Sequence, residues 1–171
     1  MAEMARELVR EMSLLHEDRE ILLQVQEDAE IIGDENMLKQ LLWIHGENAL
    51  KYSSGVIEVS VRRSDTHGYI SVRDYGIGIE AEDIPRLFDR FFRADKSRNK
   101  EIAGTGLGLS IASLIVDAHG GEILVDSTAG VGTAFTDKFL LCMDLHGGKE
   151  DIFIRGKYEN CFGASVYNGL D

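Results

Sequence analysis

Apolar residues recur along the first third of the chain at spacings that predict alternating helices and strands. Residues 4–17 place apolar side chains at positions 4, 8, 9, 12 and 15, the pattern of a helix with one buried stripe. Residues 21–26 and 29–32 alternate as two short strands do. Helical periodicity follows from about Met37 to Tyr52, with Asp34 placed to cap the first turn.

The rest of the chain adds two hairpins and a further helix. Residues 56–62 and 69–74 alternate on either side of a polar loop, which predicts a β-hairpin. A helix is expected over residues 107–118, followed by a second hairpin over residues 122–141 with its turn at 129–132. Strands in hairpins with helices between them predict an α+β fold, a two-layer α/β sandwich. Its sheet would be mixed, mostly antiparallel, and covered by helices on one face.

A long segment separates the two halves of this pattern. Residues 75–103 contain one short helical stretch, at 84–92, and a connection of this length inside a domain is usually a functional lid. Residues 84–100 carry six basic and two acidic side chains in a chain whose net charge is −12. The cationic segment suits a polyphosphate ligand, with a plain solvated loop as the alternative. The acidic chain as a whole disfavours nucleic acid and anionic membrane surfaces as partners.

Three groups of residues could carry the chemistry of such a ligand. Asn48, Lys51 and Tyr52 share one helix face and offer a carbonyl oxygen, a cation and a hydroxyl, a set that can hold Mg²⁺ and phosphate oxygens. A wet helix face is the plainer interpretation. Asp74 ends a strand, where its carboxylate can accept a hydrogen bond from the amino group of adenine. Gly76 and Gly78 behind it would let the backbone approach a ring, or would serve only as a strand exit with positive φ.

The third group is Gly104-Thr105-Gly106-Leu107-Gly108, which opens the helix expected over residues 107–118. Backbone amides at a helix N-terminus, free of bulky side chains, form an anion site. The segment lacks the Gly-Lys-Ser/Thr ending of a Walker A loop. No strand precedes it and its glycine spacing differs, so it is not a dinucleotide fingerprint either.

In this order and spacing the segments resemble the boxes of the GHKL ATP-binding family, most closely the catalytic domain of bacterial sensor histidine kinases. The resemblance covers about residues 5–141. The matching segments are Glu47-Asn48-Ala49-Leu50-Lys51-Tyr52 (N box), Asp74-Tyr75-Gly76-Ile77-Gly78 (first glycine box), Pro85 to Arg93 (F box), Gly104-Thr105-Gly106-Leu107-Gly108-Leu109 (second glycine box) and Gly130-Val131-Gly132-Thr133-Ala134-Phe135 (last box).

The resemblance implies a Bergerat-type sandwich that binds ATP and Mg²⁺ under a mobile lid at about residues 76–106. It implies Asn48, Lys51 and Arg93 as the catalytic set, with Asn48 as the magnesium ligand. Toward the base it implies Asp74 as the contact of the adenine amino group, with Gly76, Gly78 and Ile79 lining the pocket and Tyr52 bordering the nucleotide. Toward the phosphates it implies Lys51, Arg93 and the segment Gly104, Thr105, Gly106, Leu107 and Gly108, together with Asn48 through the magnesium ion. Lys96 and Thr133 complete the implied nucleotide contacts.

The function implied is that of a two-component sensor histidine kinase. Its catalytic domain positions ATP for phosphoryl transfer to a histidine on a separate dimerisation helical hairpin, and a response regulator takes part indirectly. Two departures keep alternatives open. Ile44 stands where the family often has a second asparagine, and the nearest imitation of an acceptor motif, at His16, is interpreted as structural. The alternatives are a non-catalytic nucleotide-sensing (pseudokinase) module and a serine kinase of the anti-sigma type.

The domain organisation expected is an ATP-binding domain over residues 1–141 and an extension of unknown role over residues 142–171. Both cysteines, Cys142 and Cys161, lie in the extension and fit a reducing compartment. The N-terminus lacks an apolar secretion segment, and no apolar run is long enough to cross a bilayer. A cytoplasmic location is therefore expected, without direct membrane contact by this domain. A membrane anchor elsewhere in the parent protein stays open.

Overall fold

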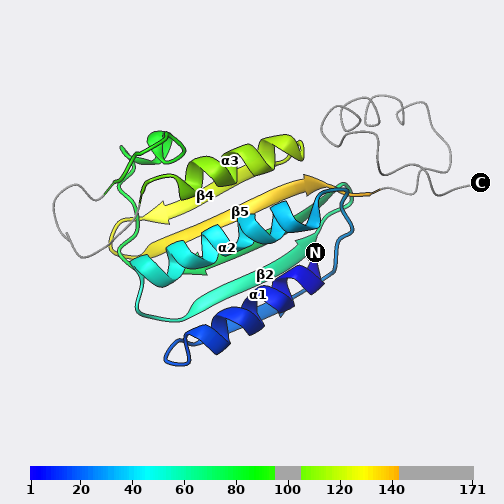
Figure 1. Ribbon diagram of the computed structural model, residues 1–171, viewed down its shortest axis with the longest axis horizontal. Coiled ribbons are helices and arrows are strands. Elements are labelled where there is room, and N and C mark those ends of the chain that lie inside the picture. The colour runs from blue at the N-terminus through cyan, green and yellow to red at the C-terminus, as the bar shows by residue number, and fades with distance from the viewer. Residues whose placement is uncertain (95–104, 143–171) are drawn as a thin grey trace, which may run out of the picture. The chain divides into compact units, whose positions relative to one another are not determined.

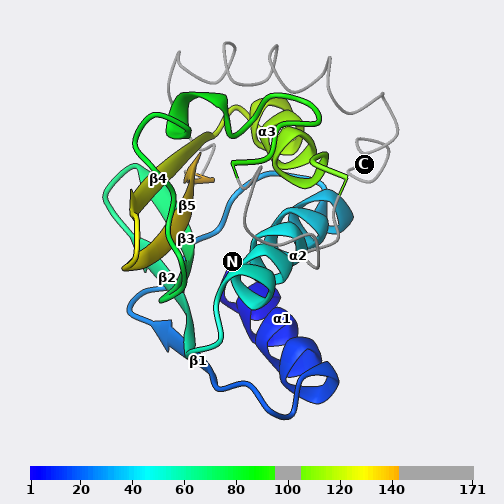
Figure 2. The same cartoon turned by 90° about the vertical axis from the view of Figure 1, so that its left-hand side faces the viewer.

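In the computed structural model, three helices pack on one face of a five-stranded sheet within the described residues (Figures 1 and 2). The structure describes residues 1–94 and 105–142. The chain divides into the units Met1–Leu141 and Cys142–Asp171, and these elements all belong to the first. No helix in the described ranges is both long enough and apolar enough to span a membrane.

The elements follow the order expected from the sequence, except that the described structure has no strand at residues 29–32. They are α1 (Ala2–Leu15), β1 (Ile21–Val25), α2 (Glu35–Tyr52), β2 (Ile57–Arg63), β3 (His67–Asp74), the short 3₁₀ helix η1 (Ile84–Arg86), α3 (Gly108–Ala118), β4 (Glu122–Thr128) and β5 (Gly132–Leu140). The strand order is β1-β2-β3-β5-β4. The β1–β2 pair is parallel and the other pairs are antiparallel. The predicted α+β sandwich with a mixed, mostly antiparallel sheet is confirmed.

Alternation along the strands separates a buried face of the sheet from an exposed one. Ile57, Val59 and Val61 of β2 are fully buried beneath the helices. The opposite face carries polar pairs such as Arg73 with Asp126, 3.2 Å apart. Figure 2 shows the three helices together on one side of the sheet. Burial of one face only is what the period-two pattern of these strands requires.

The buried apolar residues form two clusters, and α2 contributes to both. The first lies between α1, α2 and strands β2 and β3 and includes Met12, Leu42 and Val59. The second lies between α2, α3 and β5 and includes Leu41 and Phe139. Helix α2 is therefore the central element that joins the two halves of the sandwich (Figure 1).

Both ends of α2 are held by side chains from elsewhere in the chain. At its start the Asp34 carboxylate accepts the N–H of Met37 at 2.9 Å, as the sequence predicts, and the Asp34 N–H donates to Nε2 of His119 at 3.0 Å. At its end the Arg19 guanidinium donates to the carbonyl oxygens of Leu50, at 3.1 Å, and Ser53, at 3.0 Å. These bonds satisfy backbone groups that a helix end leaves unpaired.

Two local predictions were wrong. Residues 29–32 form no strand, because the N–H of Ala29 bonds the Asp28 carboxylate and its carbonyl oxygen accepts the amino group of Met1. The helical stretch expected at 84–92 is reduced to the single 3₁₀ turn of η1. Phe91 has a φ of 64°, which is incompatible with a right-handed helix.

Candidate functional site

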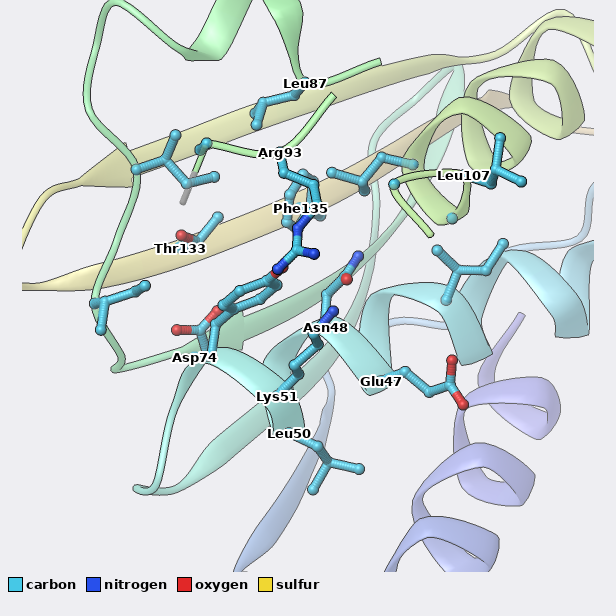
Figure 3. A pocket seen from close by; sticks show the side chains of 18 of the residues that line it. Glu47, Asn48, Leu50, Lys51, Asp74, Leu87, Arg93, Leu107, Thr133 and Phe135 are labelled. Carbon is cyan, nitrogen blue, oxygen red and sulfur yellow. The ribbon is translucent and has the colours of Figure 1, made fainter. Parts of the chain in front are cut away.

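One cavity of about 830 Å³ lies between the C-terminal half of α2, the ends of β3 and β5, and the segments on either side of residues 95–104 (Figure 3). Of the described residues implied as nucleotide contacts, only Gly76 does not line it. Lys96 and Gly104 lie outside the described residues. The residues brought together are Asn48, Lys51, Tyr52, Asp74, Gly78, Ile79, Arg93, Thr105, Gly106, Leu107, Gly108 and Thr133.

Asp74 is a buried carboxylate at one end of this cavity. It closes β3, where its backbone pairs with Thr133 of β5, and it is only 6% exposed. Its side chain accepts the N–H of Gly76 at 2.8 Å. Burial raises the pKa of Asp74 above 3.8, although the N–H groups of Gly76 and Thr133 and the charge of Arg19 act in the opposite direction. A further donor from a ligand would stabilise the ionised form.

Gly76 and Gly78 belong to the backbone segment that follows Asp74 and packs against neighbouring backbone. A Cβ on Gly76 would lie 2.1 Å from the carbonyl oxygen of Tyr52, and one on Gly78, whose φ is 64°, would lie 2.0 Å from that of Thr128. Between them the N–H of Ile77 donates to Tyr52 at 3.2 Å. Glycine is therefore required at both positions, because the backbone of α2 comes close to Gly76 and the backbone of β4 comes close to Gly78. Gly76 acts behind the cavity wall, whereas Gly78 forms part of it.

Ser127 organises the same end of the site and was missed by the sequence analysis. Its Oγ accepts the N–H of Ile79 at 2.9 Å, donates to the carbonyl oxygen of Gly132 at 3.1 Å and lies 2.8 Å from Oγ1 of Thr133. The signal was present in the alternation of β4. Ser127 is a polar residue on the face of that strand whose other members are Ile123 and Val125.

Asn48, Lys51 and Arg93 form the other part of the cavity. Figure 3 shows their side chains pointing into the same space, the first two from α2 and the third from the segment after η1. The Asn48 amide nitrogen is buried and finds no hydrogen-bond partner among the described residues. Lys51 places its ammonium 5.0 Å from the ring centre of Tyr52. Two cations and an unsatisfied amide suit a ligand with several oxygen atoms.

The start of α3 adds backbone donors to this part of the cavity. Leu107 precedes the first residue of α3, and within the described part of the chain no side chain caps this end. Residues Thr105 to Leu109 line the cavity, so the uncapped first turn of α3, with its unpaired amides, borders it. An anion can bind these amides.

Further residues line the cavity without having been predicted. Apolar surface comes from Ile77, Leu87, Phe92 and Phe135, and further polar groups come from His16, Asp18, Arg19 and Glu47. Phe135 lies on β5 in alternation with Thr133, so strand periodicity could have placed it. Arg19 and the residues of the α1–β1 loop carry no pattern that would have indicated a site.

Comparison with known proteins agrees with this geometry. Residues 33–145 match the HATPase_c family, described as histidine kinase-, DNA gyrase B- and HSP90-like ATPases. The chain is 50% identical over 122 residues to the sensor histidine kinase YkoH of Bacillus subtilis, which is 71% of this chain and 27% of that protein. It is 45% identical over 107 residues to the sensor histidine kinase WalK of the same organism, 60% of this chain and 18% of that protein. The chain thus spans about a quarter or less of these relatives.

Solved structures show the same fold. The mycobacterial sensor histidine kinase MprB superposes with a TM-score of 0.73 at 28% identity, covering 81% of this chain and 94% of that one. Full-length ShkA in complex with AMPPNP superposes with a TM-score of 0.72 at 29% identity, covering 82% of this chain and 30% of that one. The chain belongs to the histidine kinase-, DNA gyrase B- and HSP90-like ATPase family.

Proposed function

We propose that this chain is the ATP-binding catalytic domain of a two-component sensor histidine kinase. It would bind ATP with Mg²⁺ and present the γ-phosphoryl group to a histidine on a separate dimerisation helical hairpin, from which a response regulator would receive it. The observation that carries the proposal is a single cavity with a buried carboxylate at one end and two cations with an unsatisfied amide at the other. Its relatives among the sensor histidine kinases support the same assignment.

The carboxylate end suits the adenine ring. Asp74 would accept a hydrogen bond from the exocyclic amine. Burial raises the pKa of Asp74 and so disfavours its ionised form, and a hydrogen bond donated by the ligand would offset this cost. Ile79 and Gly78 would border the ring, with Thr133 held in place by Ser127. Guanine carries an acceptor where adenine carries this amine, so the same carboxylate would reject it.

The cationic end suits the phosphates. Lys51 and Arg93 would contact phosphate oxygens, and the uncapped amides at the start of α3 would contact them from the opposite side. Lys96 and Gly104, which lie outside the described residues, would belong to the same group of contacts. Tyr52 would lie between the base and the phosphates.

The residues present fit a magnesium ion held together with its nucleotide. The described ranges contain no cluster of His, Cys, Asp and Glu that could hold a metal alone. Mg²⁺ is commonly bound by few protein groups with water and substrate phosphates. Asn48 lines the cavity, and the carbonyl oxygen of its side chain is a ligand of the kind that Mg²⁺ takes, whereas its buried amide nitrogen, unpartnered among the described residues, could donate to a phosphate oxygen. Bound there, Mg²⁺ would neutralise phosphate charge.

Catalysis by this chain would then consist of positioning. The γ-phosphoryl group passes through a transition state whose charge is spread over its oxygens, so orientation and charge neutralisation lower the barrier. Asn48, Lys51 and Arg93 would provide both. The acceptor histidine would come from the partner domain. The resemblance implies a His-Glu/Asp-Leu-Arg-like motif for an acceptor, and the nearest approach to it among the five histidines of this chain, His16-Glu17-Asp18-Arg19, departs from it.

Labelled phosphoryl transfer tests this proposal. The chain is mixed with the histidine-bearing helical hairpin of its parent protein and with γ-³²P-labelled ATP and Mg²⁺. The expected product is a labelled hairpin whose phosphate is lost in acid and retained in alkali. Acid-stable, alkali-labile phosphate would identify a serine kinase instead. ATP binding without any labelled product would identify a nucleotide-sensing module.

A further inference from the structure

A histidine and an aspartate are paired in the interior directly beside the nucleotide cavity. Nε2 of His45, on α2, lies 3.1 Å from Oδ1 of Asp137, on β5, and both side chains are fully buried. Nδ1 of His45 and Oδ2 of Asp137 have no hydrogen-bond partner in the described structure. Burying polar atoms without partners lowers stability, so packing alone gives no reason for this pair.

On α2, His45 lies among residues of both apolar clusters: Leu42 and Ala49 belong to the first and Ile44 to the second. These clusters gather apolar residues only, so neither contains His45 or Asp137. At this point a hydrogen bond joins α2 to β5, in addition to the apolar contacts of the second cluster and the stacking of His45 on Phe135. A hydrogen bond has a direction, whereas apolar contacts allow a helix to rotate or slide by small amounts.

The pair is connected to the cavity wall by residues that line the cavity, Phe135 and Asn48. The ring of His45 stacks on Phe135, with the ring centres 5.0 Å apart and the planes 6° from parallel, and Phe135 lines the cavity. Asn48 follows His45 by three residues, which places both on one face of α2. Asp137 follows Phe135 by two residues, which places both on one face of β5.

Helix α2 also packs closely against α1, at the residue next to His45. A Cβ on Gly46, next to His45, would lie 2.5 Å from the sulfur of Met12 on α1. Helix α2 therefore lies tightly against α1 at the same level at which His45 bonds β5. The hydrogen bond from His45 to Asp137 lies in the helical turn that precedes Asn48.

We propose that His45 and Asp137 are positioning residues for the nucleotide site. Their hydrogen bond fixes α2 against β5, and this holds Asn48 and Phe135 at the separation that ATP with Mg²⁺ requires. This inference rests on the proposed function, because it assigns a role in the same site. It predicts that the pair contributes to ligand affinity more than to stability.

An apolar replacement of both residues separates these two contributions. Apolar residues of similar size in place of a buried polar pair usually leave stability unchanged or increase it. The double variant His45→Leu with Asp137→Val is expected to unfold at the urea concentration of the unmutated chain or higher. Its dissociation constant for ATP with Mg²⁺, measured by calorimetry, is expected to rise about tenfold, the lower end of the effect of losing a supporting contact.

A conservative variant and a matched control complete the experiment. Asp137→Asn keeps an oxygen for His45 and is expected to retain the affinity that Asp137→Val alone loses. The control removes a second β5 hydrogen bond, from Thr136 Oγ1 to Ser71 Oγ at 2.9 Å, with Thr136→Val and Ser71→Ala. Thr136 adjoins Asp137 but lies on the opposite face of the strand. ATP affinity in this control is expected to equal that of the unmutated chain.

The outcomes distinguish this inference from the proposed function. If the unmutated chain binds no ATP, the proposed function fails. If it binds ATP and the folded double variant binds equally well, the positioning role is overturned and the proposed function stands. If the double variant does not fold, the single variants decide: weaker binding by Asp137→Val than by Asp137→Asn supports the role, and equal binding overturns it.

Discussion

The N–H of Phe91 donates to the carbonyl oxygen of Gly106 at 2.9 Å. This bond joins the two described segments on either side of residues 95–104. Both partners have positive φ angles, 64° for Phe91 and 70° for Gly106. Backbone in this conformation at a non-glycine residue is strained, and such strain is often found where a segment must be held in one geometry.

Gly106→Ala is expected to destabilise the domain and weaken ATP binding. The added Cβ would lie 2.9 Å from backbone atoms of Phe91, in addition to the cost of a positive φ. That cost alone is about 1–2 kcal/mol. Gly130→Ala is the control, because Gly130 has a φ of 76° but nothing within 4 Å of its Cβ position. If urea unfolding showed the same loss of stability for both variants, the contact between Gly106 and Phe91 would have no role in stability.

Asp74→Asn is expected to weaken ATP binding and narrow the preference for ATP over GTP. The asparagine oxygen can keep the bond from Gly76, which leaves an amide donor facing the adenine amine. The loss of one buried hydrogen bond corresponds to about 1–3 kcal/mol. Calorimetry with both nucleotides measures it. Equal affinities of the unmutated chain for ATP and GTP would contradict the assignment of Asp74 to the base.

The same variant is expected to increase stability at neutral pH in the absence of nucleotide. Burial raises the folded-state pKa of Asp74 above 3.8, so the folded state carries a cost whenever this carboxylate is ionised. The cost is fully present above the raised folded pKa. It decreases as the pH falls through that pKa toward 3.8 and is absent below 3.8. The stability gained by Asp74→Asn, measured by urea unfolding, should therefore shrink as the pH falls. A gain that grows with falling pH would show that the hydrogen bonds from Gly76 and Thr133 and the charge of Arg19 outweigh the effect of burial on the pKa of Asp74.

Asn48→Ala is expected to remove the effect of Mg²⁺ on nucleotide binding. The unmutated chain should bind ATP more tightly with Mg²⁺ than with EDTA, and the variant should bind equally in both. Lys51→Gln is the comparison, since it removes a phosphate contact without removing an oxygen ligand, and it should weaken ATP binding in both buffers. An undiminished Mg²⁺ effect in Asn48→Ala would assign the metal to other groups.

Ser127→Ala is expected to lower both stability and ATP affinity. The hydroxyl is shared by Ile79, Gly132 and Thr133, so its loss leaves the N–H of Ile79 without this partner. Such a loss costs about 1–3 kcal/mol. Ser64→Ala, which removes an exposed hydroxyl bonded to His67 in the β2–β3 turn, is the control. Unchanged nucleotide affinity in a Ser127→Ala variant of reduced stability would limit Ser127 to a structural role.

Periodicity and turn residues were sufficient to predict the sandwich, because each strand buries one face and each helix one stripe. They failed at residues 29–32, where the pattern is apolar but the backbone bonds of Ala29 go to Asp28 and Met1. They also overestimated the helix after Pro85, since nothing in the sequence indicated the positive φ of Phe91. Hydrogen bonds between distant segments decide such cases.

The site was predictable as far as its residues lie in ordered motifs. Asn48, Asp74 and Gly106 come from segments far apart in the sequence, and the structure brings them to one cavity. Their roles toward ATP stay predictions. Arg19 and Ser127 were missed because their importance comes from contacts across the fold and not from neighbours in the sequence. The pairing of His45 with Asp137 likewise joins residues 92 positions apart in the sequence.

The most direct measurement of the central claim is a calorimetric titration of ATP into the folded, unmutated chain in the presence of Mg²⁺. The account predicts one binding site per chain, with GTP binding more weakly. Well-folded protein that releases or absorbs no heat with ATP at several temperatures, and whose unfolding temperature does not change with ATP, would contradict it.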